Sequence, residues 1–195
     1  MSVNQARKRK TALRGRSRSN DEHDSRARLT TLRIGHGYDL HRLIEGRPLF
    51  LAGVQISHSS GLLGHSDGDV VLHAICDAVL GAMAIGDIGQ HFPDTDERYR
   101  GIDSSELVRH VAALMRDEGW SVGNVDVTIC AEEPRLAPHR HAMRSRVADL
   151  LGAPITNVSI KAKTNEGVDA IGRGEAIAAT AVVLLEEAQG LQSKV

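Results

Sequence analysis

Two side chains that could bind a metal, one carboxylate and one imidazole, stand two residues apart in the segment LRIGHGYDLHRL. They are Asp39 and His41. In a strand, residues two apart point to the same face and lie about 7 Å apart along the chain. His73 offers a third ligand from a predicted helix. Two imidazoles and one carboxylate leave one open position on a tetrahedral zinc ion, which is the pattern of a catalytic site.

A short motif of this kind is weak evidence by itself. A D-x-H pair is more often a surface pair or a satisfied core histidine. Asp69 and Asp77, one helical turn before and after His73, are the candidates to hold its second ring nitrogen. What strengthens the metal prediction is the crowding of ligand types, beside several glycines, at His36, Asp39, His41, His65, Asp67, Asp69 and His73.

The segments that must position these ligands show strand and helix periodicities in turn. Alternation predicts strands over 32–43, 48–56 (bent near Gly53), 124–131, 157–164 and 175–187. Helical spacing predicts helices over 67–85, 103–118 and 135–151. Glycine, proline and polar residues predict turns or loops over 57–64, 86–101 and 165–174.

The starts of two helices carry capping signals. Ser66 is the predicted N-cap of the first helix, and Asp103 with Glu106 resembles a capping box. The resulting order is mainly β-β-α-α-β-α-β-β. It predicts an α/β (α+β two-layer) fold with a mainly four-stranded sheet and helices on one face. The other sheet face needs cover, which a symmetric oligomer would supply.

Charge is distributed unevenly along the chain. Residues 1–30 hold nine basic and three acidic residues, whereas the whole chain has a formal net charge of -1. We expect residues 1–31 to be a disordered basic extension, 32–187 to be the domain and 188–195 to be a tail. The acidic body argues against nucleic acid as a partner. No apolar stretch is long enough to cross a membrane, and two cysteines favour the cytoplasm.

Longer motifs make the sequence resemble a known family. They are RIGHGYDLHRL, GHSDGDVVLHAICDAVLGAMAIGDIGQHFPDTD, GNVDVTICAEEPRLAPH, IKAKTNEG and GRGEAIAA, in this order. Together they are similar to the 2-C-methyl-D-erythritol 2,4-cyclodiphosphate synthase family over about residues 32–187. The resemblance implies a metal-dependent phosphorus–oxygen lyase of the non-mevalonate isoprenoid pathway. Its substrate, 4-diphosphocytidyl-2-C-methyl-D-erythritol 2-phosphate, is cyclised to 2-C-methyl-D-erythritol 2,4-cyclodiphosphate and CMP leaves.

The resemblance also implies the roles of particular residues. Asp39, His41 and His73 match the ligands of one Zn²⁺ per subunit. Glu166 matches the ligand of a second divalent ion, Mg²⁺ or Mn²⁺, and His65 and Thr164 match the groups that stabilise the transition state. The implied substrate contacts are Asp39, His41, His65, Ser66, Asp87, Gly89, Asp94, Asp96, Ala131, Pro134, Arg135, Lys163, Thr164, Asn165, Glu166 and Arg173.

The same resemblance implies a homotrimer, with the sheets packed around a threefold axis and active sites between neighbours. Two residues depart from the usual pattern of the family. Arg135 stands where lysine is frequent, and Ala170 stands where an aromatic or large apolar residue is frequent. Two other functions compete with the cyclase. One is a zinc phosphohydrolase or phosphodiesterase, and the other is a nucleotide- or isoprenoid-binding trimer without catalysis.

Overall fold

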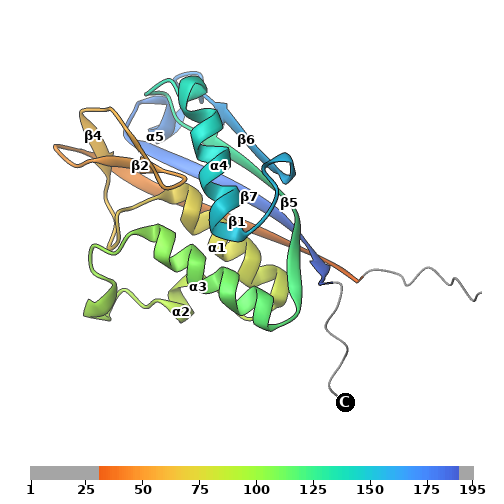
Figure 1. Cartoon of the computed structure of the whole chain (residues 1–195). Helices are drawn as coiled ribbons and strands as arrows, with labels where there is room; N and C mark the ends of the chain where they lie inside the picture. Colours follow the sequence, from red (N-terminus) through yellow and green to blue (C-terminus); the bar gives the residue numbers. More distant parts are fainter. Residues whose placement is uncertain (1–30, 189–195) are drawn as a thin grey trace, which may run out of the picture.

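A single mixed sheet, covered on one face by helices, organises the part of the chain that the computed structural model describes, residues 31–188 (Figure 1). The predicted N-terminal extension and C-terminal tail lie outside the described residues, except for Thr31 and Ala188. The sheet has the strand order β4-β1-β7-β5-β6. Its strands are β1 (Leu32–Glu45), β4 (Ser60–Leu62), β5 (Trp120–Cys130), β6 (Val158–Lys163) and β7 (Ala176–Glu187).

The pairing of these strands is mostly antiparallel. β7 lies between β1 and β5 and runs antiparallel to both, whereas β6 is parallel to β5. The prediction of four strands was wrong by one. Three residues of the predicted 57–64 turn form β4, which pairs with the end of β1 through Leu43 and Leu62. So short a strand gives no readable alternation.

The helices lie over one face of the sheet (Figure 1). Three of them are long: α1 (Val70–Met83), α3 (Ser104–Asp117) and α4 (Arg140–Leu151). The predicted loops also contain helical turns. In 86–101 these are α2 (Ile88–His91) and η1 (Glu97–Tyr99), and in 165–174 there is α5 (Asp169–Gly172). The helix predicted from residue 135 starts at Arg140, after the 3₁₀ turn η2 (Ala137–His139); a further such turn, η3, spans Ile155–Asn157.

The helix α1 is pressed directly against β1. A Cβ atom added to Gly37 would lie 2.0 Å from the carbonyl oxygen of Ala74, and one added to Gly35 would lie 1.8 Å from that of Ala78. Only glycine permits so close an approach between strand and helix backbones. This contact brings the face of β1 that bears Asp39 toward the first turns of α1.

A small hairpin packs beside the N-terminus of α1. Its strands are β2 (Leu49–Leu51) and β3 (Val54–Ile56), which pair antiparallel. The sequence predicted one strand bent near Gly53, and this was wrong. Ala52 and Gly53 both have positive φ, 55° and 70°, as in a two-residue hairpin turn.

The second face of the sheet is open in the described chain. Five large apolar side chains project from β1 and β7 on that face: Leu32 (55% exposed), Ile34 (72%), Tyr38 (53%), Leu40 (43%) and Val182 (42%). An apolar patch of this kind marks an interaction surface. Among the described residues, no helix is long and apolar enough to span a bilayer.

Candidate metal centre and substrate pocket

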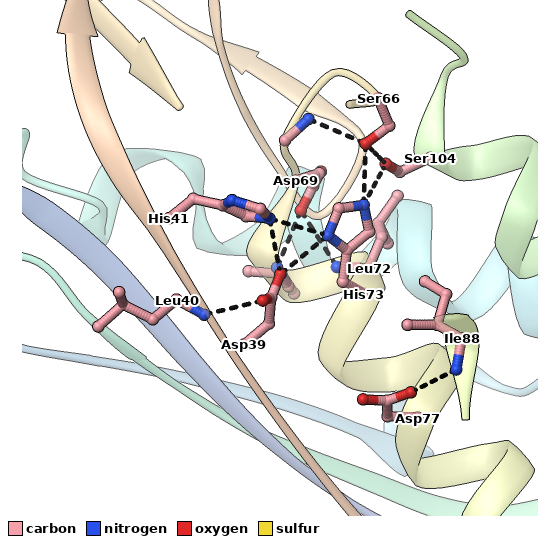
Figure 2. A network of polar contacts seen from close by, with 12 residues as sticks. Asp39, Leu40, His41, Ser66, Asp69, Leu72, His73, Asp77, Ile88 and Ser104 are labelled. Carbon is pink, nitrogen blue, oxygen red and sulfur yellow. Dashed lines mark hydrogen bonds and ion pairs between the residues drawn. The ribbon is translucent and has the colours of Figure 1, made fainter. Parts of the chain in front are cut away.

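Three side chains from two elements converge on one point, as Figure 2 shows. Asp39 Oδ2 lies 3.1 Å from His41 Nε2 and 2.8 Å from His73 Nδ1. The two ring nitrogens are 3.3 Å apart. The other oxygen of Asp39, Oδ1, accepts a hydrogen bond of 2.9 Å from the amide of Leu40, so Oδ2 is turned toward the histidines. The predicted trio is therefore assembled.

The donor set fits a zinc ion. A tetrahedral zinc with bonds of about 2.0–2.1 Å holds its ligand atoms about 3.3–3.4 Å apart. The three atoms of Asp39, His41 and His73 are 2.8–3.3 Å apart, so outward shifts of a few tenths of an ångström would suffice. Two imidazoles and one carboxylate also match the preference of zinc for nitrogen and oxygen.

Electrostatics keep the carboxylate ready to bind a cation. Burial raises the pKa of Asp39, but hydrogen bonds from His41 and His73 outweigh burial and hold that pKa well below its usual range. The hydrogen bond to Asp39 in turn raises the pKa of His41, although burial opposes it. An anionic carboxylate is thus available as a ligand at neutral pH.

The helix that carries His73 is fixed by Asp69. This aspartate, not the predicted Ser66, is the N-cap of α1, because its Oδ1 accepts from the amides of Val71 (3.0 Å) and Leu72 (3.1 Å). It also accepts from the hairpin-turn amides, Ala52 N at 2.9 Å and Gly53 N at 2.6 Å. The side chain is fully buried. One carboxylate therefore joins the hairpin to the helix that presents His73, a candidate metal ligand.

The second nitrogen of His73 has partners that the sequence did not predict. Its Nε2 lies 3.0 Å from Ser66 Oγ and 2.9 Å from Ser104 Oγ (Figure 2). The expectation that Asp69 or Asp77 would hold this nitrogen was wrong. Asp69 is occupied as a cap, and Asp77 accepts from the amide of Ile88 at 2.8 Å.

Asp39, His41 and His73, called the metal trio below, line a pocket of about 450 Å³. Its walls come from the segments after β4 and α1 and from the start of α3. They include His65, Gly89 and Asp94, together with apolar side chains at Ile88, Phe92, Pro93, Tyr99, Ile102 and Leu107. The buried Nε2 of His65 has no hydrogen-bond partner among the described residues. A buried polar atom of this kind beside a pocket calls for a partner, and a polar ligand is one candidate.

Two of the predicted contacts near this pocket have local hydrogen bonds instead. Asp87 caps α2 and accepts from the amide of Gln90 at 2.9 Å. Asp96 caps η1 and forms an ion pair with Arg98 at 2.6 Å. Neither lines the pocket, whereas Gly89 and Asp94 do. Their prediction as substrate contacts stays a prediction.

A second pocket, of about 260 Å³, collects most of the other predicted residues. It is formed by the turn after β5, the start of α4 and the end of β6. Ala131, Pro134, Arg135, Lys163 and Thr164 all line it. No residue lines both this pocket and the one beside the metal trio.

The loop that follows β6 holds the remaining predicted residues. Thr164 Oγ1 donates to Glu166 Oε1 at 2.9 Å, and Glu166 has a φ of 52°, in the left-handed region. Asn165 Nδ2 donates to Asp169 at 3.0 Å. Arg173 donates two hydrogen bonds, of 2.8 and 3.1 Å, to the exposed carboxylate of Glu175.

Comparisons with known proteins all find similarity to the same family. The YgbB family model matches residues 32–186. The 2-C-methyl-D-erythritol 2,4-cyclodiphosphate synthase of Idiomarina loihiensis is 57% identical over 155 residues, 80% of this chain and 98% of that protein. The solved bifunctional IspDF from Campylobacter jejuni is similar with a TM-score of 0.78 and 39% identity, over 81% of this chain and 43% of that one. A CDP-bound 2C-methyl-D-erythritol-2,4-cyclodiphosphate synthase has a TM-score of 0.73 and 42% identity, over 78% of this chain and 99% of that one.

Proposed function

The chain belongs to the YgbB family, and from this premise we propose that it converts 4-diphosphocytidyl-2-C-methyl-D-erythritol 2-phosphate to 2-C-methyl-D-erythritol 2,4-cyclodiphosphate and CMP. It is a metal-dependent lyase of isoprenoid precursor synthesis. The observation that carries the proposal is the joint arrangement of Asp39, His41 and His73 at a pocket that His65 also lines. With a metal ion bound, this arrangement would offer a cation and a hydrogen-bonding group to a phosphate.

The reaction needs positioning more than it needs a protein nucleophile. An oxygen of the substrate's 2-phosphate attacks the β-phosphorus, and a new phosphorus–oxygen bond closes the ring. The bond from the β-phosphorus to the bridging oxygen breaks, and CMP leaves with that electron pair. No water is consumed. Phosphoryl transfers of this type are catalysed by alignment of the reacting groups and by neutralisation of charge.

Each group of the metal pocket has a part in that alignment. Asp39, His41 and His73 would hold one Zn²⁺ per subunit, which when bound supplies a Lewis acid that polarises a phosphate oxygen. His65 lines the same pocket and would donate to a phosphate oxygen as charge develops there. The apolar wall that includes Ile88, Phe92 and others limits the access of water.

The second pocket would hold the cytidine end of the substrate. Ala131, Pro134 and Arg135 surround a space next to Lys163 and Thr164, as expected for a base and its phosphates. Glu166 lies within hydrogen-bond reach of Thr164 and would bind Mg²⁺ or Mn²⁺ through its carboxylate. The solved CDP-bound relative supports a cytidine diphosphate ligand. The remaining predicted contacts, at Ser66, Asp87, Asp96, Asn165 and Arg173, belong to the same proposal.

Both pockets serve one substrate if neighbouring subunits meet. The apolar sheet face, exposed at Ile34, Tyr38 and Val182, becomes the interface of a homotrimer. The metal pocket of one subunit then faces the cytidine pocket of the next, which explains why a single chain keeps them apart. The two free cysteines, Cys76 and Cys130, fit the cytoplasm as the compartment.

Phosphorus NMR of a reaction mixture tests the proposed activity. Purified protein with zinc and magnesium is incubated with the proposed substrate, and a sample treated with a chelator serves as the control. The expected result is free CMP with two coupled resonances of a cyclic diphosphate, absent from the control. CMP with the open-chain 2,4-bisphosphate or free phosphate would establish a hydrolase and overturn the proposal, as would no turnover by the zinc-loaded protein.

A further inference from the structure

The ring of His73 has a different environment at each nitrogen. Nδ1 faces Asp39 Oδ2 at 2.8 Å, on the metal side. Nε2 faces two buried hydroxyls on the other side, Ser104 Oγ at 2.9 Å and Ser66 Oγ at 3.0 Å (Figure 2). Ser104 is the first residue of α3, so the metal ligand on α1 is supported by a second helix.

The hydrogen bonds of Ser104 fix the direction of its own proton. Ser104 Oγ donates to Asp67 Oδ1 at 2.5 Å, and the Ser104 amide donates to Asp67 Oδ2 at 3.1 Å. A serine hydroxyl has only one proton, and here Asp67 accepts it. The lone pairs of Ser104 Oγ are therefore left to accept from His73 Nε2 and from the Ser66 hydroxyl, which lies 3.2 Å away.

Those lone pairs favour one tautomer of the metal-bound histidine. A neutral imidazole carries its proton on one nitrogen and a lone pair on the other. Because Ser104 Oγ accepts at Nε2, it favours a proton on Nε2, and the lone pair of Nδ1 is then available to a metal ion held by Asp39, His41 and His73. The Nδ1 atom is the one that points at Asp39 and His41. The hydrogen bonds from Asp67 through Ser104 thus orient His73 so that its Nδ1 can bind a metal ion.

We propose that Ser104 and Asp67 are positioning residues of the metal centre. The chain Asp67–Ser104–His73 locks the ring orientation and the Nε2–H tautomer, and the negative charge of Asp67 makes Nδ1 a stronger ligand. Ser104 is fully buried, so these hydrogen bonds form away from bulk water, where they are stronger. The inference rests on the zinc site of the proposed function and is independent of the reaction catalysed there.

The chain provides a matched control in the neighbouring serine. Ser104 and Ser105 are both buried, with 0% and 1% exposure, in the first turn of α3. The Ser105 hydroxyl accepts from Arg146 at 3.2 Å, and no contact with His73 is seen among the described residues. Ser104→Ala and Ser105→Ala therefore remove the same atom at the same depth, and only one of them touches the metal ligand.

The experiment measures zinc affinity by competition with a chelator of known affinity. We expect Ser104→Ala to weaken zinc binding about 10–100-fold and Ser105→Ala to leave it nearly unchanged. Asp67→Asn should lie between the two, because the amide keeps one acceptor but loses the charge. Circular dichroism of the metal-free proteins checks that all variants are folded. If Ser104→Ala binds zinc like the parent chain, or if Ser105→Ala loses as much, the proposal is overturned.

Nitrogen NMR of the histidines gives a second readout that a merely structural role would not move. In the zinc-bound parent protein, we expect His73 to carry a slowly exchanging proton on Nε2. In Ser104→Ala this proton should exchange faster. A proton on Nδ1 in the parent protein would overturn the proposal. If the parent protein binds no zinc, the proposed metal site is wrong. If Ser104→Ala weakens zinc binding as expected but the parent protein forms no cyclic product, only the proposed reaction is wrong.

Discussion

His65 and His73 lie at the same pocket but have opposite environments. His73 has neighbours at both nitrogens, Asp39 and two serines, whereas His65 Nε2 is buried with no partner in residues 31–188. We therefore expect the two alanine variants to fail in different ways. His73→Ala should lose bound zinc and turnover together. His65→Ala should keep its zinc and lose about 10²–10³-fold in kcat, as for removal of one transition-state donor.

The measurement for both variants is zinc content per chain together with kcat. Size-exclusion chromatography serves as the control for assembly, which both variants should retain. Full zinc and full turnover in His73→Ala would show that the ligand assignment is wrong. Loss of zinc from His65→Ala would place that histidine in the metal centre.

The convergence of Asp39, His41 and His73 was easier to predict from the sequence than the residues that support them. Asp39 and His41 follow from the period of a strand, and His73 follows from the crowding of ligand types. Ser104 is 31 residues beyond His73 and meets it only because α3 crosses the start of α1. No spacing rule connects such positions. Asp69 was predicted to contact His73 because the two are one helical turn apart. Its carboxylate instead accepts hydrogen bonds from four backbone amides.

At the scale of elements, two aspartates cap two helices under different conditions. Asp69 caps α1, is fully buried and accepts four backbone amides, two of them from the hairpin turn. Asp103 caps α3, is exposed and accepts one amide, that of Ser105. Asp69→Ala should therefore destabilise the protein by about 3 kcal/mol or more, and Asp103→Ala by about 1 kcal/mol.

Denaturant unfolding of the two capping variants compares these costs. The difference in the free energy of unfolding is the quantity of interest, because each variant removes the same carboxylate. Equal losses would mean that the amides of Ala52 and Gly53 find other partners when Asp69 is removed.

Two glycines test the contact between β1 and α1. A Cβ at Gly37 would lie 2.0 Å from the Ala74 carbonyl oxygen, whereas a Cβ at Gly81, on the exposed side of α1, meets nothing within 4 Å. Gly37→Ala should destabilise by about 3 kcal/mol or more and weaken zinc binding, because α1 must move away from Asp39. Gly81→Ala should stabilise by up to about 1 kcal/mol.

Thermal unfolding and zinc titration of both glycine variants check this prediction. A Gly37→Ala protein as stable as the parent, with unchanged zinc affinity, would show that the strand and helix can separate without moving the ligands. A marked loss in Gly81→Ala would point instead to a general intolerance of changes in α1.

Long periodic elements were predictable from the sequence, and short ones were not. The strands β1, β6 and β7 and the helix α3 lie close to their predicted ranges. The strand β4 has three residues, and α2 and α5 have four each, too few to show a period. The hairpin was mistaken for one bent strand because Ala52 takes a positive φ, which is unusual for a residue other than glycine.

At the scale of the whole molecule, the main feature is the sheet face that residues 31–188 leave uncovered. Ile34 is 72% exposed in the single chain, so Ile34→Lys should cost a monomer little. In a trimer it would bury a charge. We expect this variant to sediment as a smaller species, to keep its zinc and to lose most turnover. Glu118→Lys, an exposed change at the end of α3, is the control and should change none of these.

Analytical ultracentrifugation and turnover of the two charge variants decide the point. A parent protein that is monomeric and fully active would contradict the proposed trimer. So would an Ile34→Lys variant that assembles and turns over like the parent.

The need to cover this sheet face was predictable from the sequence, since helices were predicted for one side of the sheet only. The separation of the two pockets was not readable, because it depends on where β5, β6 and the loops end in space.

We expect the substrate's own phosphate, and not water, to attack the β-phosphorus. The most direct test is a turnover in water labelled with the heavy oxygen isotope, followed by mass spectrometry of both products. We expect a cyclic diphosphate and CMP that carry no label. Label in CMP, or in an open-chain 2,4-bisphosphate formed in place of the cyclic product, would show that water is the nucleophile and that the proposed cyclisation is wrong.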